Sequence, residues 1–249
     1  MSDVFPHRLA RILSALQLSS ALCTRVPAHT PNSTTRTMPP LTVGIAGITG
    51  QLGGLLALKL LDNPNIGSLR GYARDVKKVH PRLDGNPRVQ LFVGAALNDR
   101  AIKPFVKDCD VVVCAYLGPD DIMIDGQKKL IDACEEAGVP RYVASDWALD
   151  FTKLQLGELF LKDPMIHIKA YLETKSKVKG IHILNGAFMD MIFSDFFRMW
   201  DDDKGLIRYW GKGDEPWETT SYTNAAEFTA AVIADTSAVG VIKCEMPFP

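Results

Sequence analysis

Cysteine is scarce in this chain, and its few copies are not grouped. The five cysteines form neither a CxxC pair nor a cluster with histidine: Cys23, Cys109, Cys114, Cys134 and Cys244. Structural zinc sites and disulfide frameworks need such groupings, so the sequence argues against both and we expect no bound metal. Scattered thiols of this kind are typical of reduced proteins inside a cell.

The sequence also lacks a long apolar run and an excess of charge of either sign. No stretch reaches the roughly 18 apolar residues that a membrane-spanning helix needs. The 28 basic and 29 acidic side chains give a formal net charge of −1. Such a chain has no general positive field for nucleic acid or for an anionic membrane, and we expect neither as a partner. The remaining composition, 47% hydrophobic and 23% charged, is that of an ordinary globular domain.

Acidic residues are nearly absent from residues 1–38, where Asp3 is the only one. Four arginines stand there among serines, threonines and prolines: Arg8, Arg11, Arg25 and Arg36. This composition fits a mitochondrial transit segment. It also fits a disordered extension ahead of a cytoplasmic protein that begins near Met38, which is the interpretation we favour. In both cases the expected folded part is residues 39–249, a dinucleotide-binding domain with a small substrate lobe from about residue 186.

The most informative stretch is LTVGIAGITGQLGGLLALKLL, residues 41–61. Residues 41–46 are typical of a buried parallel strand, and an apolar helix follows a glycine turn over residues 47–53. This context predicts a dinucleotide site in which Gly47 makes the turn, Gly50 lets a pyrophosphate approach the backbone, and Gly53 lets the helix lie close to the strand. The turn residues Thr49, Gln51 and Leu52 complete the expected cofactor-binding set. A tight turn without a ligand is the competing interpretation.

The second expected strand, residues 68–73, ends in Arg74 and Asp75. At this position an acidic residue usually holds the ribose 2′-hydroxyl of NAD, whereas an arginine holds the 2′-phosphate of NADP. Since Arg74 comes first, the sequence favours NADP (NADPH) over NAD. Two alternatives stay open: Asp75 could accept a hydrogen bond from a free ribose hydroxyl, and Arg74 could be only a solvated charge.

The rest of the chain alternates strands and helices. Expected strands are 89–94, 110–116, 141–145 and 181–184; expected helices are 98–106, 124–137, Pro164 to about Lys179 with Asp163 as its cap, an aromatic helix 191–200, and 222–234. This alternation predicts an α/β fold with a doubly wound parallel sheet, the Rossmann fold. Ligands bind outside the carboxyl ends of such strands, so Tyr116, Leu117 and Gly118 are expected to line the cofactor cleft. A plain turn would look the same.

Residues from Met38 to about Ile242 resemble the NmrA-like and isoflavone-reductase-like group of atypical short-chain dehydrogenases. The resemblance rests on GITGQLG at 47–53, Arg74, RYVASDW at 141–147, Lys169 and GAFMD at 186–190. In reductases of this group a lysine on the corresponding helix sits near the nicotinamide ribose and the substrate. The resemblance therefore implies a catalytic and cofactor-binding role for Lys169, with Ser145 as a hydrogen-bonding partner of the substrate or carboxamide.

The sequence departs from ordinary short-chain dehydrogenases, which use a Tyr-x-x-x-Lys pair for acid–base chemistry. Met165 stands four residues before Lys169 and cannot act as an acid. Tyr171 and Lys175 have the right spacing, but they lie too far beyond Ser145, and we interpret the match as coincidence. Members of this group usually continue beyond the position of Pro249, so the expected substrate lobe is either small or truncated.

Two functions fit these observations. The first is an NADPH-dependent oxidoreductase of the NmrA-like type, acting on a small organic carbonyl or alkene, with the aromatic helix as a pocket wall. The second is a non-catalytic NADP(H)-binding redox sensor that acts through a regulatory protein partner. The second would account for the missing tyrosine and the short lobe.

Overall fold

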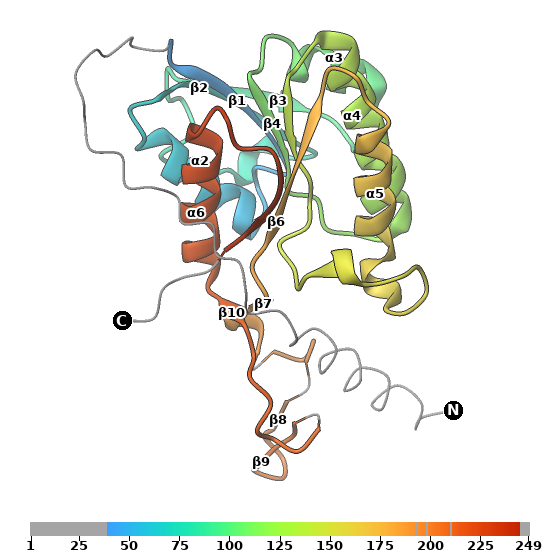
Figure 1. Ribbon diagram of the computed structural model, residues 1–249. Helices are drawn as coiled ribbons and strands as arrows, with labels where there is room; N and C mark the ends of the chain where they lie inside the picture. Colours follow the sequence, from blue (N-terminus) through green and yellow to red (C-terminus); the bar gives the residue numbers. More distant parts are fainter. Residues whose placement is uncertain (1–38, 193, 198, 210, 245–249) are drawn as a thin grey trace, which may run out of the picture.

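A single parallel sheet forms the centre of the molecule (Figure 1). The computed structural model describes residues 39–244 apart from Phe193, Arg198 and Trp210, so the predicted extension 1–38 lies outside the described residues. The strands are β1 (Leu41–Ala46), β2 (Ile66–Ala73), β3 (Val89–Val93), β4 (Val111–Cys114), β5 (Arg141–Val143), β6 (Lys179–Leu184) and β11 (Gly240–Lys243). They are paired in the order β3-β2-β1-β4-β5-β6-β11. The order reverses between β1 and β4, which confirms the predicted doubly wound fold.

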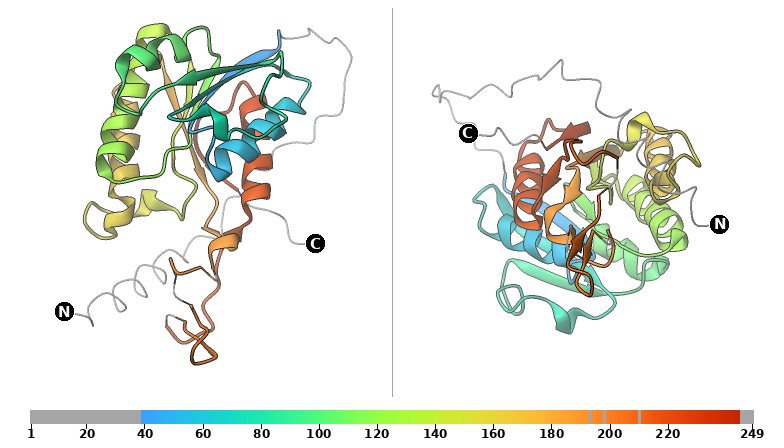
Figure 2. Two further views of the ribbon diagram at one scale, coloured as in Figure 1. Left: turned by 180° about the vertical axis from the view of Figure 1, so that it is seen from behind. Right: turned by 90° about the horizontal axis from the view of Figure 1, so that it is seen from below.

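Helices cover both faces of the sheet (Figures 1 and 2). One face carries α2 (Gln51–Leu61) and α6 (Tyr222–Ala234), and the other carries α3 (Asp99–Val106), α4 (Gln127–Ala137) and α5 (Asp163–Glu173). Five short helical turns connect these elements: η1 (Val76–Lys78), η2 (Asp121–Gly126), η3 (Phe151–Lys153), η4 (Phe160–Lys162) and η5 (Met189–Met191). In the described part of the chain, none of the helices has the length and apolarity to cross a bilayer.

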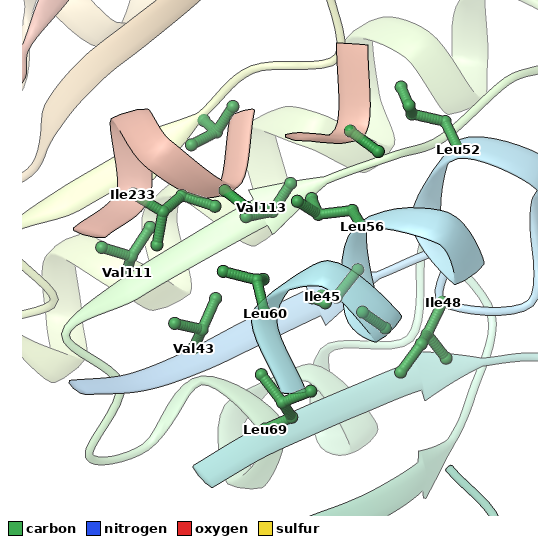
Figure 3. Close-up of a cluster of buried hydrophobic side chains, with 14 of the residues drawn as sticks. Val43, Ile45, Ile48, Leu52, Leu56, Leu60, Leu69, Val111, Val113 and Ile233 are labelled. Carbon is green, nitrogen blue, oxygen red and sulfur yellow. The ribbon is translucent and has the colours of Figure 1, made fainter. Parts of the chain in front are cut away.

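The alternation of side chains along each strand divides the core into two layers. Val43 and Ile45 of β1 and Val113 of β4 face α2 and α6, where Leu56 and Ile233 pack against them (Figure 3). The alternate positions of the same strands face α3 and α4 and form the second layer with Phe105, Leu130 and Ile131: Ala46, Val112 and Cys114. Both faces of β4 are therefore buried, which explains why its sequence is a continuous apolar run.

The turn between β1 and α2 is compact because glycine occupies its two tightest positions. Gly47 has a φ of +88°, and a Cβ there would collide with the carbonyl oxygen of Ala115 beyond β4. A Cβ on Gly53 would collide with the carbonyl oxygen of Gly47. The first turn of α2 therefore lies directly against the end of β1, as the sequence predicts.

Arg141, the first residue of β5, ties α6 to the sheet. Its buried guanidinium donates hydrogen bonds to the carbonyl oxygens of Asp235, at 2.7 Å, and Ile233, at 3.0 Å. These carbonyls belong to the carboxyl end of α6, which has no further helical partners for them. A cation at this end also interacts favourably with the helix dipole.

Residues 186–220 leave the sheet and form a separate excursion (Figures 1 and 2). At its base, β7 (Ala187–Phe188) pairs with β10 (Thr219–Thr220). Further out, β8 (Trp200–Asp201) pairs with β9 (Leu206–Ile207). The predicted aromatic helix 191–200 is wrong: η5 ends at Met191, turns follow, Trp200 lies in β8, and Phe193 is outside the described residues. Phe196 is 61% exposed, so apolar composition there reflects no buried helical stripe.

Strands β2 to β6 differ from the predicted bounds by one or two residues at one or both ends, and two helices and one strand differ more. The helix predicted from Pro164 to about Lys179 ends at Glu173, and its cap is Lys162, with Asp163 inside the helix. The helix predicted from residue 124 is α-helical only from Gln127, after the π-helical turn η2. The strand β11 was not predicted, because three of its four residues are exposed and it lacks a buried apolar pattern.

The early end of α5 has a specific cause in the carboxylate of Glu135 on α4. This carboxylate accepts hydrogen bonds from the amides of Ser176, Lys177 and Val178, at 2.9–3.2 Å, and from the Ser176 hydroxyl at 2.7 Å. These contacts hold the connection to β6 in a non-helical conformation. The same hydrogen bonds lower the pKa of Glu135 to about 2.

The glycine turn gives the first prediction, with a matched control in the same helix. Gly53→Ala should lower the free energy of unfolding by about 1–3 kcal/mol, because the new methyl group forces α2 away from β1. In Gly54→Ala the added Cβ lies 3.5 Å from the carbonyl oxygen of Ile48, an ordinary contact. That variant should be neutral or more stable by up to about 1 kcal/mol. Urea unfolding of both variants measures the difference; equal effects would contradict the proposed packing role of Gly53.

The hydrogen bonds that the Glu135 carboxylate accepts predict how the stability of the protein changes in acid. Because the folded-state pKa is depressed, the stabilisation is present above the ordinary pKa of a glutamate and is lost as the pH falls toward about 2. Glu135→Gln should therefore cost roughly 1 kcal/mol at neutral pH, since the carboxylate is partly solvated, and the gap to the unmodified chain should shrink below about pH 4 and close as the pH approaches about 2. Thermal unfolding across this range tests it. A gap that is independent of pH would contradict the assignment.

Candidate functional site

The amino terminus of α2 opens at the carboxyl edge of the sheet, next to the ends of β1 and β4. Gly50 is its N-cap, no side chain caps the helix, and its first turn carries no acidic residue. The amides of this turn and the helix dipole together favour an anionic ligand. Gly50 and Gln51 are exposed and Thr49 is half-buried, whereas the side chain of Leu52 packs into the core. Leu52 can therefore meet a ligand only through its backbone.

Arg74 follows the end of β2 and is exposed to solvent. Within the described residues, its guanidinium has no hydrogen-bond or ion-pair partner. Asp75 is engaged instead: its carboxylate caps η1 by accepting a hydrogen bond from the amide of Lys77 at 3.1 Å, and it lies 4.0 Å from the ammonium of Lys78. Of the two neighbours, Arg74 is the one whose side chain has no partner among the described residues.

The residues after β4 divide into an exposed part and a buried part. Leu117 is 93% exposed beside Gly118, so both can line a cleft at this edge. The Tyr116 ring instead turns toward Gly126 of η2, and burial raises the pKa of its hydroxyl well above the ordinary range. The carbonyl oxygen of Tyr116 accepts a hydrogen bond from the Ser145 hydroxyl at 2.7 Å.

Ser145 follows β5 and joins the two neighbouring strand ends. It is buried, its hydroxyl donates to Tyr116, and its amide donates to the side-chain oxygen of Gln127 at 3.1 Å. The hydroxyl proton is thus used within the fold, and the oxygen lone pairs are what Ser145 can offer to a ligand. Its role toward the substrate stays a prediction.

Lys169 lies on α5 and forms an ion pair with Glu173 one turn later. The lysine side chain is 30% exposed. The amino end of α5 is at the carboxyl edge of the sheet, and Lys169 is six residues further along, or about 9 Å along the helix axis. Its part in catalysis or cofactor binding, implied by the resemblance, stays a prediction.

Tyr171 and Lys175 both bind Asp132 on α4, and not a group at the carboxyl edge of the sheet. The Tyr171 hydroxyl donates to Asp132 at 2.7 Å, and the Lys175 ammonium binds the same carboxylate at 2.6 Å. The ammonium also lies 4.0 Å from the centre of the Tyr171 ring. These contacts give both residues a structural role between two helices, which agrees with our interpretation of their spacing as coincidence.

A group of buried polar atoms marks the same edge of the sheet. Four buried side-chain atoms lack a hydrogen-bond partner among the residues that the structure describes: Tyr116 Oη, Asp146 Oδ1, and Asn185 Nδ2 and Oδ1. They belong to the segments that follow β4, β5 and β6, three neighbouring strands. Buried polar atoms without partners are costly, so their concentration at one edge points to a place where water or a ligand completes the structure.

Asp146 and His182 form a buried pair that the sequence analysis missed as part of the site. Asp146 Oδ2 lies 2.7 Å from His182 Nδ1, and both side chains are almost fully buried. Burial raises the pKa of Asp146, and His182 opposes this shift. The sequence feature that could have identified Asp146 is its position directly after an expected buried strand. Its pairing with His182, 36 residues away, depends on the adjacency of β5 and β6.

Comparison with known proteins agrees with this geometry. The model of the family described as NAD(P)H-binding matches residues 47–236, from the glycine turn to the residues after α6. The sterol-4-alpha-carboxylate 3-dehydrogenase, decarboxylating, of Mus musculus is 30% identical over 143 residues, covering 53% of this chain and 37% of the mouse protein. The chain therefore spans little more than a third of the length of this curated relative.

Two solved structures share the fold. AtPrR2 with NADP+ and (+)pinoresinol is 19% identical, with a TM-score of 0.66 over 83% of this chain and 70% of that chain. An isoflavone reductase is 18% identical, with a TM-score of 0.64 over 84% of this chain and 70% of that chain. The expected likeness to the isoflavone-reductase-like group is thus confirmed for the fold. Since the family model matches most of the chain, this protein belongs to the NAD(P)H-binding family.

Proposed function

We propose that this protein is an NADPH-dependent oxidoreductase that reduces a small organic carbonyl or alkene. The observation that carries the proposal is the uncapped amino terminus of α2, with Gly47 and Gly53 clearing the space beside it. A pyrophosphate fits this place because backbone amides and the helix dipole both favour it. The buried polar atoms after β4, β5 and β6 lie across the switch point, on the side where the reactive half of a dinucleotide would extend.

The proposed cofactor is NADPH rather than NADH. Arg74 is exposed and unpaired among the described side chains, whereas Asp75 already caps η1. A guanidinium matches the 2′-phosphate of NADP with two parallel hydrogen bonds, which a free ribose hydroxyl cannot provide. That AtPrR2 was solved with NADP+ supports the same preference.

In the proposed reaction the bound NADPH supplies the hydride. The chain itself holds the diphosphate at residues 47–53 and the 2′-phosphate at Arg74, while Leu117 and Gly118 line the cleft. Ser145 fixes the ends of β4 and β5 relative to each other and offers an acceptor to the substrate or the carboxamide. The sterol dehydrogenase and isoflavone reductase names place relatives of this chain among oxidoreductases, which supports the class of reaction.

A second candidate function is a redox sensor that binds NADP(H) and acts through a protein partner. One observation favours it: the excursion 186–220 does not form the predicted pocket wall but exposes large apolar side chains. They are Met189, Phe196, Trp200, Leu206, Ile207 and Tyr209. Such exposure suits contact with another protein.

The cofactor preference can be measured by titrating NADPH and NADH in parallel by calorimetry. Arg74→Ala should weaken NADPH binding by roughly 1–3 kcal/mol, about a fivefold to 150-fold rise in Kd, and leave NADH binding unchanged. Arg100→Ala, which removes an exposed arginine on α3, is the control and should change neither. Equal weakening of both cofactors by Arg74→Ala would speak against a 2′-phosphate contact.

Turnover separates the two candidate functions. With saturating NADPH, a panel of ketones, aldehydes and enones should include at least one class whose addition oxidises the cofactor, measured by the loss of NADPH absorbance. The control is the same panel with protein denatured by heat. Tight NADPH binding without oxidation by any class would contradict the reductase and favour the sensor.

A further inference from the structure

The segment that follows β5, residues 144–148, forms an elbow that several contacts hold in place. The Trp147 backbone has a φ of +32°, a conformation that L residues rarely adopt. Its indole N–H donates to the Thr229 hydroxyl of α6 at 3.0 Å, and Ala148 forms a bridge to Leu184 at the end of β6. Backbone strain of this kind persists only where surrounding contacts hold it, and it occurs preferentially at functional sites. The residue that this elbow orients is Asp146.

One carboxylate oxygen of Asp146 is hydrogen-bonded, and the other has no hydrogen-bond partner among the described residues. Oδ2 pairs with His182 Nδ1 at 2.7 Å, so the histidine fixes the plane of the carboxylate. Oδ1 is buried and has no hydrogen-bond partner among the described residues. A buried carboxylate oxygen without a donor is costly, and the cost is relieved when a cation or a proton approaches it.

Lys162 stands one turn before Met165, which lies in one buried cluster with Ala148, two residues beyond Asp146. It is the N-cap of α5, at the carboxyl edge of the sheet, and its side chain is partly buried. Within the chain that the structure describes, its ammonium forms no ion pair or hydrogen bond, and Asp146 is the charged group that acts on it. Burial lowers the pKa of Lys162 because it disfavours the ammonium, and Asp146 opposes this shift.

Lys162 and Lys169 differ in whether the ammonium is already held by an ion pair with another described residue. A proton donor needs an ammonium that is not held in this way. Lys169 has a partner on its own helix, Glu173, which holds its charge on the side of α5. Lys162 stands at the start of the same helix and has no hydrogen-bond or ion-pair partner among the described side chains. It is also partly exposed, so it can exchange a proton with water.

We infer that Lys162 is the proton donor to the substrate, and that Asp146, oriented by His182, is the positioning residue of its ammonium. This inference rests on the proposed function. NADPH supplies the hydride, which forms the new C–H bond. The electron pair that leaves the C=O or C=C bond takes a proton from Lys162, so one N–H bond breaks and one O–H or C–H bond forms. The neutral amine then regains a proton from water, and the cofactor is left as NADP+.

Amine labelling tests the placement of Lys162 without requiring turnover. The full-length protein is treated at about pH 8 with a limiting amount of an acetylating ester, with and without saturating NADPH, and the modified peptides are quantified by mass spectrometry. Lys162 should react severalfold faster than exposed Lys107, because more of it is neutral, and NADPH should protect it at least about fivefold. Lys162 labelling that matches Lys107 and ignores NADPH, in protein shown to bind NADPH, would overturn the inference.

The same measurement tests the positioning residue. Asp146→Asn removes the charge that favours the ammonium, so Lys162 should label still faster relative to Lys107 in a variant that melts cooperatively. A purely structural aspartate would leave that ratio unchanged, which would contradict the positioning role. If the variant does not fold, His182→Gln, which keeps the size and polarity of the pair, replaces it with the same expectation of an altered ratio.

Kinetics with a substrate found in the panel complete the test. Lys162→Met should lower kcat about a hundredfold or more with the Kd for NADPH changed less than about threefold, whereas Lys107→Met should leave both unchanged. Full activity of Lys162→Met, or a loss confined to Lys169→Met, would overturn the inference while the oxidoreductase proposal stands. Protection of Lys162 without turnover of any substrate would instead end the oxidoreductase proposal and support the placement alone.

Discussion

The approach of the first turn of α2 to the ends of β1 and β4 is the contact on which the site depends. It is a contact between main-chain atoms: the carbonyl oxygens of Gly47 and Ala115 lie where side chains would otherwise extend from Gly53 and Gly47. Because no side chain separates these segments, the free amides of α2 are held at a fixed place above the sheet. A phosphate bound there meets a preformed set of donors and pays little for ordering them.

The sheet edge beyond this contact has two chemically different halves. Toward β2, the nucleotide would meet exposed charge: Arg74 has no partner among the described residues, and Asp75 caps η1. Toward β5 and β6, the edge is buried and contains the Asp146–His182 pair and polar atoms that lack partners in the part of the chain that the structure describes. Screening by water is weak in that half, so each proton and each charge has a larger effect on a reacting group than it would at the surface.

The sequence predicts the local parts of this structure and misses the parts that depend on distant contacts. The bounds of β1 and α6, the Asn98 cap of α3 and the glycine turn follow from short-range patterns, and the structure reproduces them. Asn98 accepts a hydrogen bond from the amide of Ala101, as its position predicts. The end of α5 could not be predicted in this way, because the amides that would continue the helix are bound by Glu135 on another element.

The candidate site shows the same division. Gly47, Gly50, Gly53 and Arg74 could be predicted as cofactor-binding residues because a strand, a turn and a helix follow one another in the chain. The Asp146–His182 pair could not be predicted, since the two residues meet only when β5 and β6 are neighbours. No periodicity in the sequence encodes that arrangement, and the one lysine suggested by the resemblance lies elsewhere on α5.

The short pairing of β7 with β10 has a consequence for how such a protein can change. It closes the excursion at its base, and the two ends are independently anchored by β6 in the sheet and by α6, which Arg141 secures. The entropy of closing a loop grows only slowly with its length, so insertions or deletions between the two short strands disturb the Rossmann core little. Changes in this region can therefore alter the molecules that the protein meets while the sheet and the glycine turn keep their structure.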